Sequence, residues 1–181
     1  MDDASLRTAL LVARVAESHG CLQPGDWPDV AVSLVLEGNE DPEIAELAGL
    51  SPGANGWDTE PLVAAAYERH GVPVPGRDES TDLITRLMAD EIRARPAAIT
   101  APMTRLLARI APPDFESDLA NRCFTAEEYL DCGCAEVDLG FETELQSTPS
   151  LGLPAALVQA LARPLRSTLP TPQPPHGHHD H

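Results

Sequence analysis

The sequence contains no lysine, and all 12 of its basic residues are arginine. Without lysine the chain cannot form a Schiff base, supply a Walker A lysine or use a serine–lysine dyad. The motifs His-Glu-x-x-His and Gly-x-Gly-x-x-Gly are also absent from the sequence. We therefore expect a binding protein more than an enzyme, although an active site assembled from scattered acids stays open.

Aromatic residues make up only 4% of the 181 residues, whereas hydrophobic residues reach 43%. This hydrophobic content is typical of a folded chain. The apolar residues are mostly alanine, leucine and valine, which suit helices that pack closely. No segment alternates apolar and polar residues for long enough to predict a strand. We predict an all-α protein, a single compact array of about eight short helices.

Capping residues and glycines place the predicted helices along the chain. Asp41-Pro42 combines an N-cap aspartate with proline at the first helical position. Ser80 or Thr81 is expected to cap the helix that begins at these residues. Glycines at 20, 38, 49 and 71 are expected to end helices. From residue 114 onward the pattern is weaker. The predicted helices have bounds near 6–18, 26–38, 41–49, 61–70, 80–95, 102–111 and 154–165, with short and weaker helical pieces at 114–122, 125–131 and 138–146.

We expect residues 1–166 to form an acidic helical domain, with two candidate lobes at 1–111 and 112–166. Residues 167–181 are rich in proline and histidine and are predicted to form a flexible tail. No apolar run approaches the length of a membrane span, and Met1-Asp2-Asp3 is acidic where a secretory signal is basic. These features predict a cytoplasmic protein whose cysteines are reduced thiols or metal ligands.

The formal charge of −17 is concentrated in two blocks. Residues 1–58 carry 11 acids against two arginines, and residues 114–150 carry ten acids against one. This balance excludes a basic footprint for direct binding of nucleic acid. It favours a cationic partner, a cation or simple solubility. Carboxylate clusters such as Glu40, Asp41 and Glu43 are expected on solvated helix faces, which are poor places for catalysis.

The cysteines suggest a metal site. His19-Gly-Cys21 and Cys132-Gly-Cys134 share a layout in which the glycine lets both ligands turn the same way. Together they could bind zinc tetrahedrally, with Cys123 as a substitute ligand. Against this interpretation, paired zinc ligands usually have two or more residues between them. The alternative is reduced cysteines that act as small hydrophobic residues, with His19 at a helix end.

The end of the chain offers a second set of metal ligands. Its last six residues contain His176, His178, His179 and His181. Crowded imidazoles bind transition metals such as nickel and zinc, although any tract of this kind also binds them adventitiously. Transition-metal binding through this tail, through the cysteine pairs or through both is therefore one functional hypothesis.

The leading hypothesis is a non-catalytic, acidic helical protein that binds another protein, as an adaptor, a regulator or an immunity-like protein. A basic partner neutralised by the acids at 26–46 and 114–144 is its concrete form. We expect no direct contact with nucleic acid and no membrane partner, and the oligomeric state stays open. The few aromatic residues, including Trp27 and Trp57, are expected to fill the core.

Overall fold

The computed structural model describes residues 1–94 and 141–167, and this part of the chain is helical, with no strand. The all-α prediction is therefore confirmed. Helices predicted at 102–111, 114–122 and 125–131 lie outside the described residues, as does nearly all of the predicted tail. The elements are α1 (Asp3–Ser18), the 3₁₀ turn η1 (Pro24–Asp26), α2 (Trp27–Leu36), α3 (Pro42–Ala48), α4 (Gly56–Arg69), α5 (Arg77–Ala94), α8 (Phe141–Ser147) and α9 (Ala155–Ser167).

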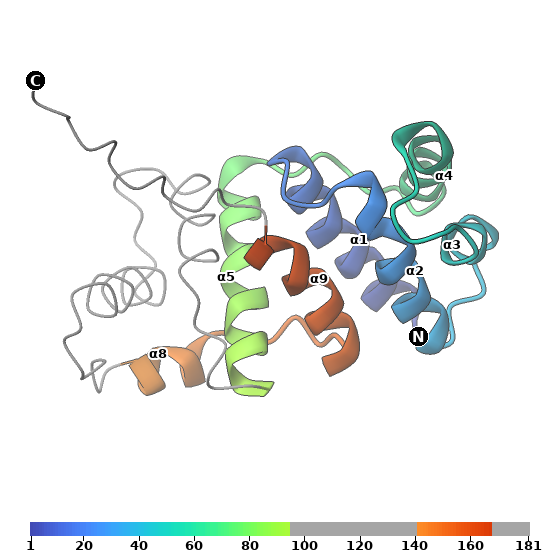
Figure 1. The fold of residues 1–181 in the computed structure, drawn as a ribbon. Helices are drawn as coiled ribbons and strands as arrows, with labels where there is room; N and C mark the ends of the chain where they lie inside the picture. The colour runs from blue at the N-terminus through green and yellow to red at the C-terminus, as the bar shows by residue number, and fades with distance from the viewer. Residues whose placement is uncertain (95–140, 168–181) are drawn as a thin grey trace, which may run out of the picture.

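The described helices are arranged side by side along the length of the molecule. α8 and then α5 lie at one side and α3 and α4 lie at the other, with α1, α2 and α9 between them (Figure 1). α1 packs against both α5 and α9, and α2 packs against both α3 and α9. Among the described residues, no helix is long and apolar enough to cross a membrane.

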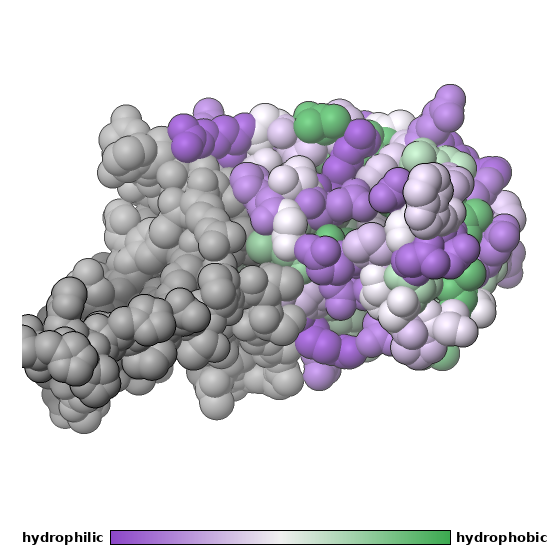
Figure 2. Space-filling view, turned by 45° about the horizontal axis from the view of Figure 1, so that its top comes forward, coloured by the Kyte–Doolittle hydropathy of each residue, from purple (hydrophilic) through white to green (hydrophobic). Residues whose placement is uncertain are grey.

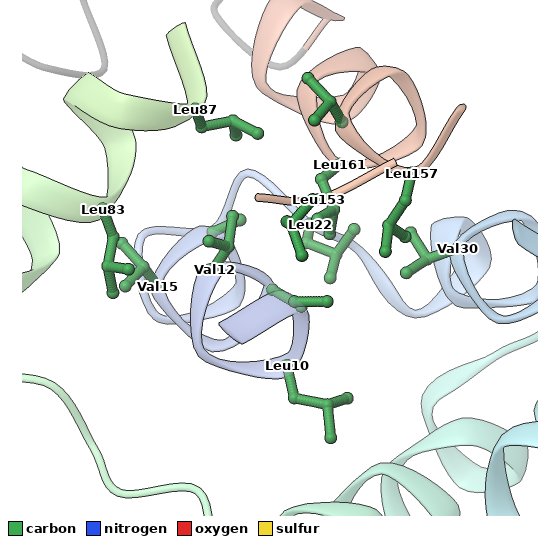
Figure 3. Close-up of a cluster of buried hydrophobic side chains, with 14 of the residues drawn as sticks. Leu10, Val12, Val15, Leu22, Val30, Leu83, Leu87, Leu153, Leu157 and Leu161 are labelled. Carbon is green, nitrogen blue, oxygen red and sulfur yellow. The ribbon is translucent and has the colours of Figure 1, made fainter. Parts of the chain in front are cut away.

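A single cluster of aliphatic side chains forms the core. α1 buries side chains around more than half of its circumference, which gives the other helices a continuous apolar surface to pack on. Leu83 of α5 lies beside Val15 of α1, and Leu157 of α9 lies beside Val30 of α2 (Figure 3). Packing of small aliphatic residues between closely spaced helices explains how so few aromatic residues suffice.

Glycine ends α1 in the way that the sequence predicts. Gly20 has a φ of +67°, a conformation that residues with a Cβ rarely adopt. This turn lets the amide of Cys21 donate to the carbonyl oxygen of Ala16 at 2.8 Å, as in a Schellman motif. α4 ends in the same manner at Gly71, where Val72 N donates to Tyr67 O at 2.8 Å.

Two helices begin earlier than the sequence predicts. α4 begins at Gly56 and not at Pro61, because the side chain of Asn55 caps it by accepting from Trp57 N at 2.8 Å. α5 begins at Arg77, ahead of Ser80 and Thr81, which were expected as caps. Both hydroxyls instead donate to backbone carbonyls four residues earlier, at 2.8 and 2.9 Å, a bond that is made within a helix.

Glu17 joins α1 to α2 and α4. Its carboxylate accepts from Trp27 Nε1 at 3.4 Å and from the hydroxyl of Tyr67 at 3.2 Å. The two rings meet edge to face, with centroids 6.1 Å apart. Burial and the Glu17 charge raise the pKa of Tyr67, so its hydroxyl remains protonated and continues to donate. The guanidinium of Arg14 lies 4.6 Å from the Tyr67 ring centroid.

Polar residues of α5 hold the segment that leads into α9. Asp90 accepts from Leu151 N at 2.8 Å and from the hydroxyl of Ser150 at 3.1 Å. Arg93 pairs with Asp90 at 2.6 Å, and Arg86 donates to the carbonyl oxygen of Ser150 at 2.8 Å. These bonds satisfy a buried carboxylate and fix where α9 enters the core.

Two leucines of α2 test the core by a matched comparison. Leu34 is fully buried, whereas Leu36 is 80% exposed. We expect Leu34→Ala to lower the free energy of unfolding by about 2–5 kcal/mol, because it leaves a cavity. Leu36→Ala should change it by less than about 0.5 kcal/mol. Urea unfolding followed by circular dichroism measures both, and equal losses in the two variants would contradict this core.

Candidate functional site

Asp41 is the centre of a polar cluster between α3 and α4. It is the N-cap of α3, and its Oδ1 accepts from the amides of Glu43 and Ile44 at 3.0 and 3.1 Å. Its Oδ2 lies 2.8 Å from Nε2 of His70, the residue that caps the end of α4. The Asp41 side chain is only 4% exposed. Asp41 therefore serves as a cap and as a tertiary contact at once.

The C-terminal end of α4 supplies the nitrogen groups that contact the carboxylates of this cluster. Arg69 pairs with Glu43 and lies 3.4 Å from Asp41 through its Nε. His70 reaches α1 through its Nδ1, which lies 3.4 Å from Oδ1 of Asp3. The expectation that Asp41 and Glu43 lie on solvated faces is therefore wrong, because the fold places a guanidinium and an imidazole against them.

The hydrogen bonds of Asp41 determine its protonation. Burial on its own would raise the pKa of the carboxyl group. The bonds from the Ile44 amide and from the His70 side chain outweigh burial, so the pKa of Asp41 lies below its usual value of 3.8. Asp41 is consequently a fixed negative charge at neutral pH, which makes it a poor acceptor of protons in catalysis.

A surface hollow of about 420 Å³ lies over this cluster. Its lining includes Asp2, Asp3, Asn39, Glu40 and the Asp41–His70 pair. The described residues that line it include no serine, threonine or cysteine, so the aspartate–histidine pair has no nucleophile to activate. The hollow can bind a ligand through charge and hydrogen bonds.

Only two of the predicted metal ligands lie in the described part of the chain. Cys21 is 1% exposed and belongs to the hydrophobic core, with its Sγ 3.6 Å from the carbonyl oxygen of His19. Across residues 1–94 and 141–167, no group of three or more His, Cys, Asp or Glu side chains could hold a metal ion. The other predicted ligands lie outside the described residues: Cys123, Cys132, Cys134, His176, His178, His179 and His181.

The outer side of α2 is a second candidate site. Val32, Val35 and Leu36 are 41%, 37% and 80% exposed. They are three and four residues apart, so their side chains are neighbours on the helix surface. We call these three residues the α2 face. Figure 2 shows hydrophobic surface among hydrophilic surface at the end of the molecule where α2, α3 and α4 lie.

Trp57 is also exposed, and the prediction that it fills the core is wrong. It is 92% exposed in the first turn of α4, whereas Trp27 is buried as predicted. The early start of α4 at Gly56 places Trp57 on the helix and directs it to solvent. The α2 face could have been found from the sequence, because only Asp29 and Ser33 interrupt the apolar residues of α2.

Comparison with protein-family models, curated proteins and solved structures finds no match to this chain.

Asp41 provides a test of the cluster at neutral pH. We expect Asp41→Ala to lower the free energy of unfolding by about 1–2 kcal/mol, because the α3 cap is lost. Asp41→Asn retains an acceptor for the two amides but loses the charge that faces His70 and Arg69. Urea unfolding should therefore place Asp41→Asn between the wild type and Asp41→Ala. An alanine variant as stable as the wild type would contradict the capping role.

The pKa of Asp41 also predicts a pH dependence. Because this pKa is lower in the folded state, the ionised carboxylate stabilises the fold above the usual value of 3.8. That stabilisation is lost as the pH falls through the folded pKa. The difference in unfolding free energy between wild type and Asp41→Asn should therefore shrink with acidification below the usual value. Parallel stability curves for the two proteins across this range would contradict the prediction.

Proposed function

We propose that this chain is a non-catalytic, acidic helical protein that binds another protein. The observation that carries the proposal is the α2 face, an apolar surface on a helix whose opposite side is already buried. Single exposed apolar residues are common on proteins, but a contiguous group on one helix marks an interaction surface. Trp57 supports the proposal, because tryptophan is enriched among the residues that contribute most to protein–protein binding.

The chemistry of the polar cluster agrees with a role in binding. The side chains of Asp41 and His70 already make structural contacts that join α1, α3 and α4. Its charges are satisfied within the fold, and the hollow above it lacks a nucleophile among the described residues. A role as adaptor, regulator or immunity-like protein requires a surface of this kind and no reacting groups.

Site-specific photocrosslinking tests the proposal. A photoreactive residue in place of Leu36 should capture a defined protein in the cells that naturally produce the chain. The same residue in place of Val74, which is 70% exposed outside the helices, is the matched control. With the captured partner purified, we expect Leu36→Asp to weaken its binding by about thirtyfold or more, the effect of losing a hot spot. Equal capture at positions 36 and 74, or unchanged affinity of Leu36→Asp, would contradict the proposal.

Metal binding is the second candidate function, and the four histidines among the last six residues are the observation that favours it. Elemental analysis of the full chain, purified without a metal column, tests both ligand sets. Zinc held by the cysteines should be lost in Cys132→Ser/Cys134→Ser and retained when residues 174–181 are removed. Nickel or zinc held by the tail should show the reverse. A metal-free wild-type protein would contradict this function.

A further inference from the structure

The charges around the α2 face indicate what kind of partner it binds. Residues 26–46 include seven acids and no basic residue. The fold supplies cations to some of these acids: Arg163 of α9 pairs with Asp29 at 2.7 Å, and Arg69 binds Asp41 and Glu43. These arginines neutralise Asp29 in the first turn of α2 and the two acids at the start of α3.

Four of the seven acids have no cation partner among the described residues. One of them, Asp26, accepts from the amide of Gln23 at 2.8 Å; the other three lie at and beyond the end of α2. Among residues 1–94 and 141–167, Glu37, Glu40 and Glu46 have no ion-pair partner. Glu37 directly follows Leu36, Glu40 is in the connection between α2 and α3, and Glu46 is on α3, which packs against α2. Glu37 and Glu40 therefore lie at and just beyond the end of α2, where Leu36, the most exposed apolar side chain of that helix, is found.

One cation lies near this end of α2. The α-amino group of Met1 donates to the carbonyl oxygen of Glu37 at 2.7 Å. Two further acids, Asp2 and Asp3, follow it directly and line the same hollow as Glu40. Arg69 and His70, which also line the hollow, are already bound to carboxylates. The local field at the end of α2 is consequently negative, and it attracts positive charge.

We propose that the α2 face binds a basic amphipathic helix of another protein. This inference rests on the proposed function and specifies the partner's chemistry. The exposed side chains of Val32, Val35 and Leu36 form a ridge. The apolar side of a second helix can pack against this ridge. Lysine or arginine side chains at the edge of that helix then meet Glu37, Glu40 and Glu46. The apolar contact holds the complex, and the charges orient the helix and accelerate association.

Synthetic helices test the inference with the full chain. The probe is an amphipathic peptide of about four turns, with leucine on one side and lysine at every polar position. A matched peptide carries glutamate in place of lysine, and a third has the lysine peptide's composition in scrambled order. Fluorescence anisotropy should show binding of the lysine helix at least about tenfold tighter than binding of either control. Its affinity should fall as the salt concentration rises.

Protein variants separate specific recognition from attraction to an acidic chain. Glu37→Gln/Glu40→Gln/Glu46→Gln should weaken binding of the lysine helix about tenfold. The matched control, Glu60→Gln/Glu68→Gln/Glu79→Gln, removes the same charge from exposed glutamates elsewhere and should change binding less than about twofold. Circular dichroism confirms that each variant is folded.

The outcomes distinguish this inference from the proposed function. If Leu36→Asp abolishes binding while the two glutamine triples behave alike, the apolar surface is a docking site but the basic partner is wrong. If the glutamate helix binds as tightly as the lysine helix, or neither binds, the inference is overturned. If Leu36→Asp also leaves binding of the lysine helix unchanged, the α2 face is not the docking site and the proposed function loses its main support.

Discussion

The burial of Trp27 determines which side of α2 faces water. Trp27 is among the largest fully buried side chains, bonded to Glu17 and in edge contact with Tyr67. Val30 and Leu34 are buried on the same side of the helix. Because this side anchors α2, the helix cannot turn to bury its other apolar residues without exposing the tryptophan. The exposed valines and Leu36 follow from that constraint, and the proposed binding role depends on it.

Much of the fold could be predicted because its signals are local. The Asp41 cap and the Gly20 and Gly71 stops each act within a few residues of the helix end that they define. Prediction failed where one local signal overrode another. Pro61 suggested a helix start, but Asn55 caps the helix five residues earlier. Ser80 suggested a cap, but its hydroxyl bonds to the carbonyl oxygen of Gly76, directly before the first residue of α5.

The candidate site depends on contacts that no local pattern contains. Asp41 and His70 are 29 residues apart, so their pairing becomes visible only when α3 and α4 pack together. For that reason the local sequence pattern predicted that the acids at 40–43 face solvent. The predicted helix near 61–70 ends at His70, the residue that caps α4 in the structure, but the carboxylate partners of His70 could not be inferred. The α2 face was within reach, because an apolar helix beside an acidic stretch suggests a partner.

The contrast between the two tryptophans gives the chain a pair of built-in optical reporters. Trp27 is 1% exposed and Trp57 is 92% exposed, and the chain has no third tryptophan. An indole in an apolar interior emits at shorter wavelength than one in water, and a dissolved quencher reaches only the latter. The emission spectrum of the native chain is therefore a sum of two separable signals. One follows the integrity of the helical core, and the other follows the solvent at the start of α4.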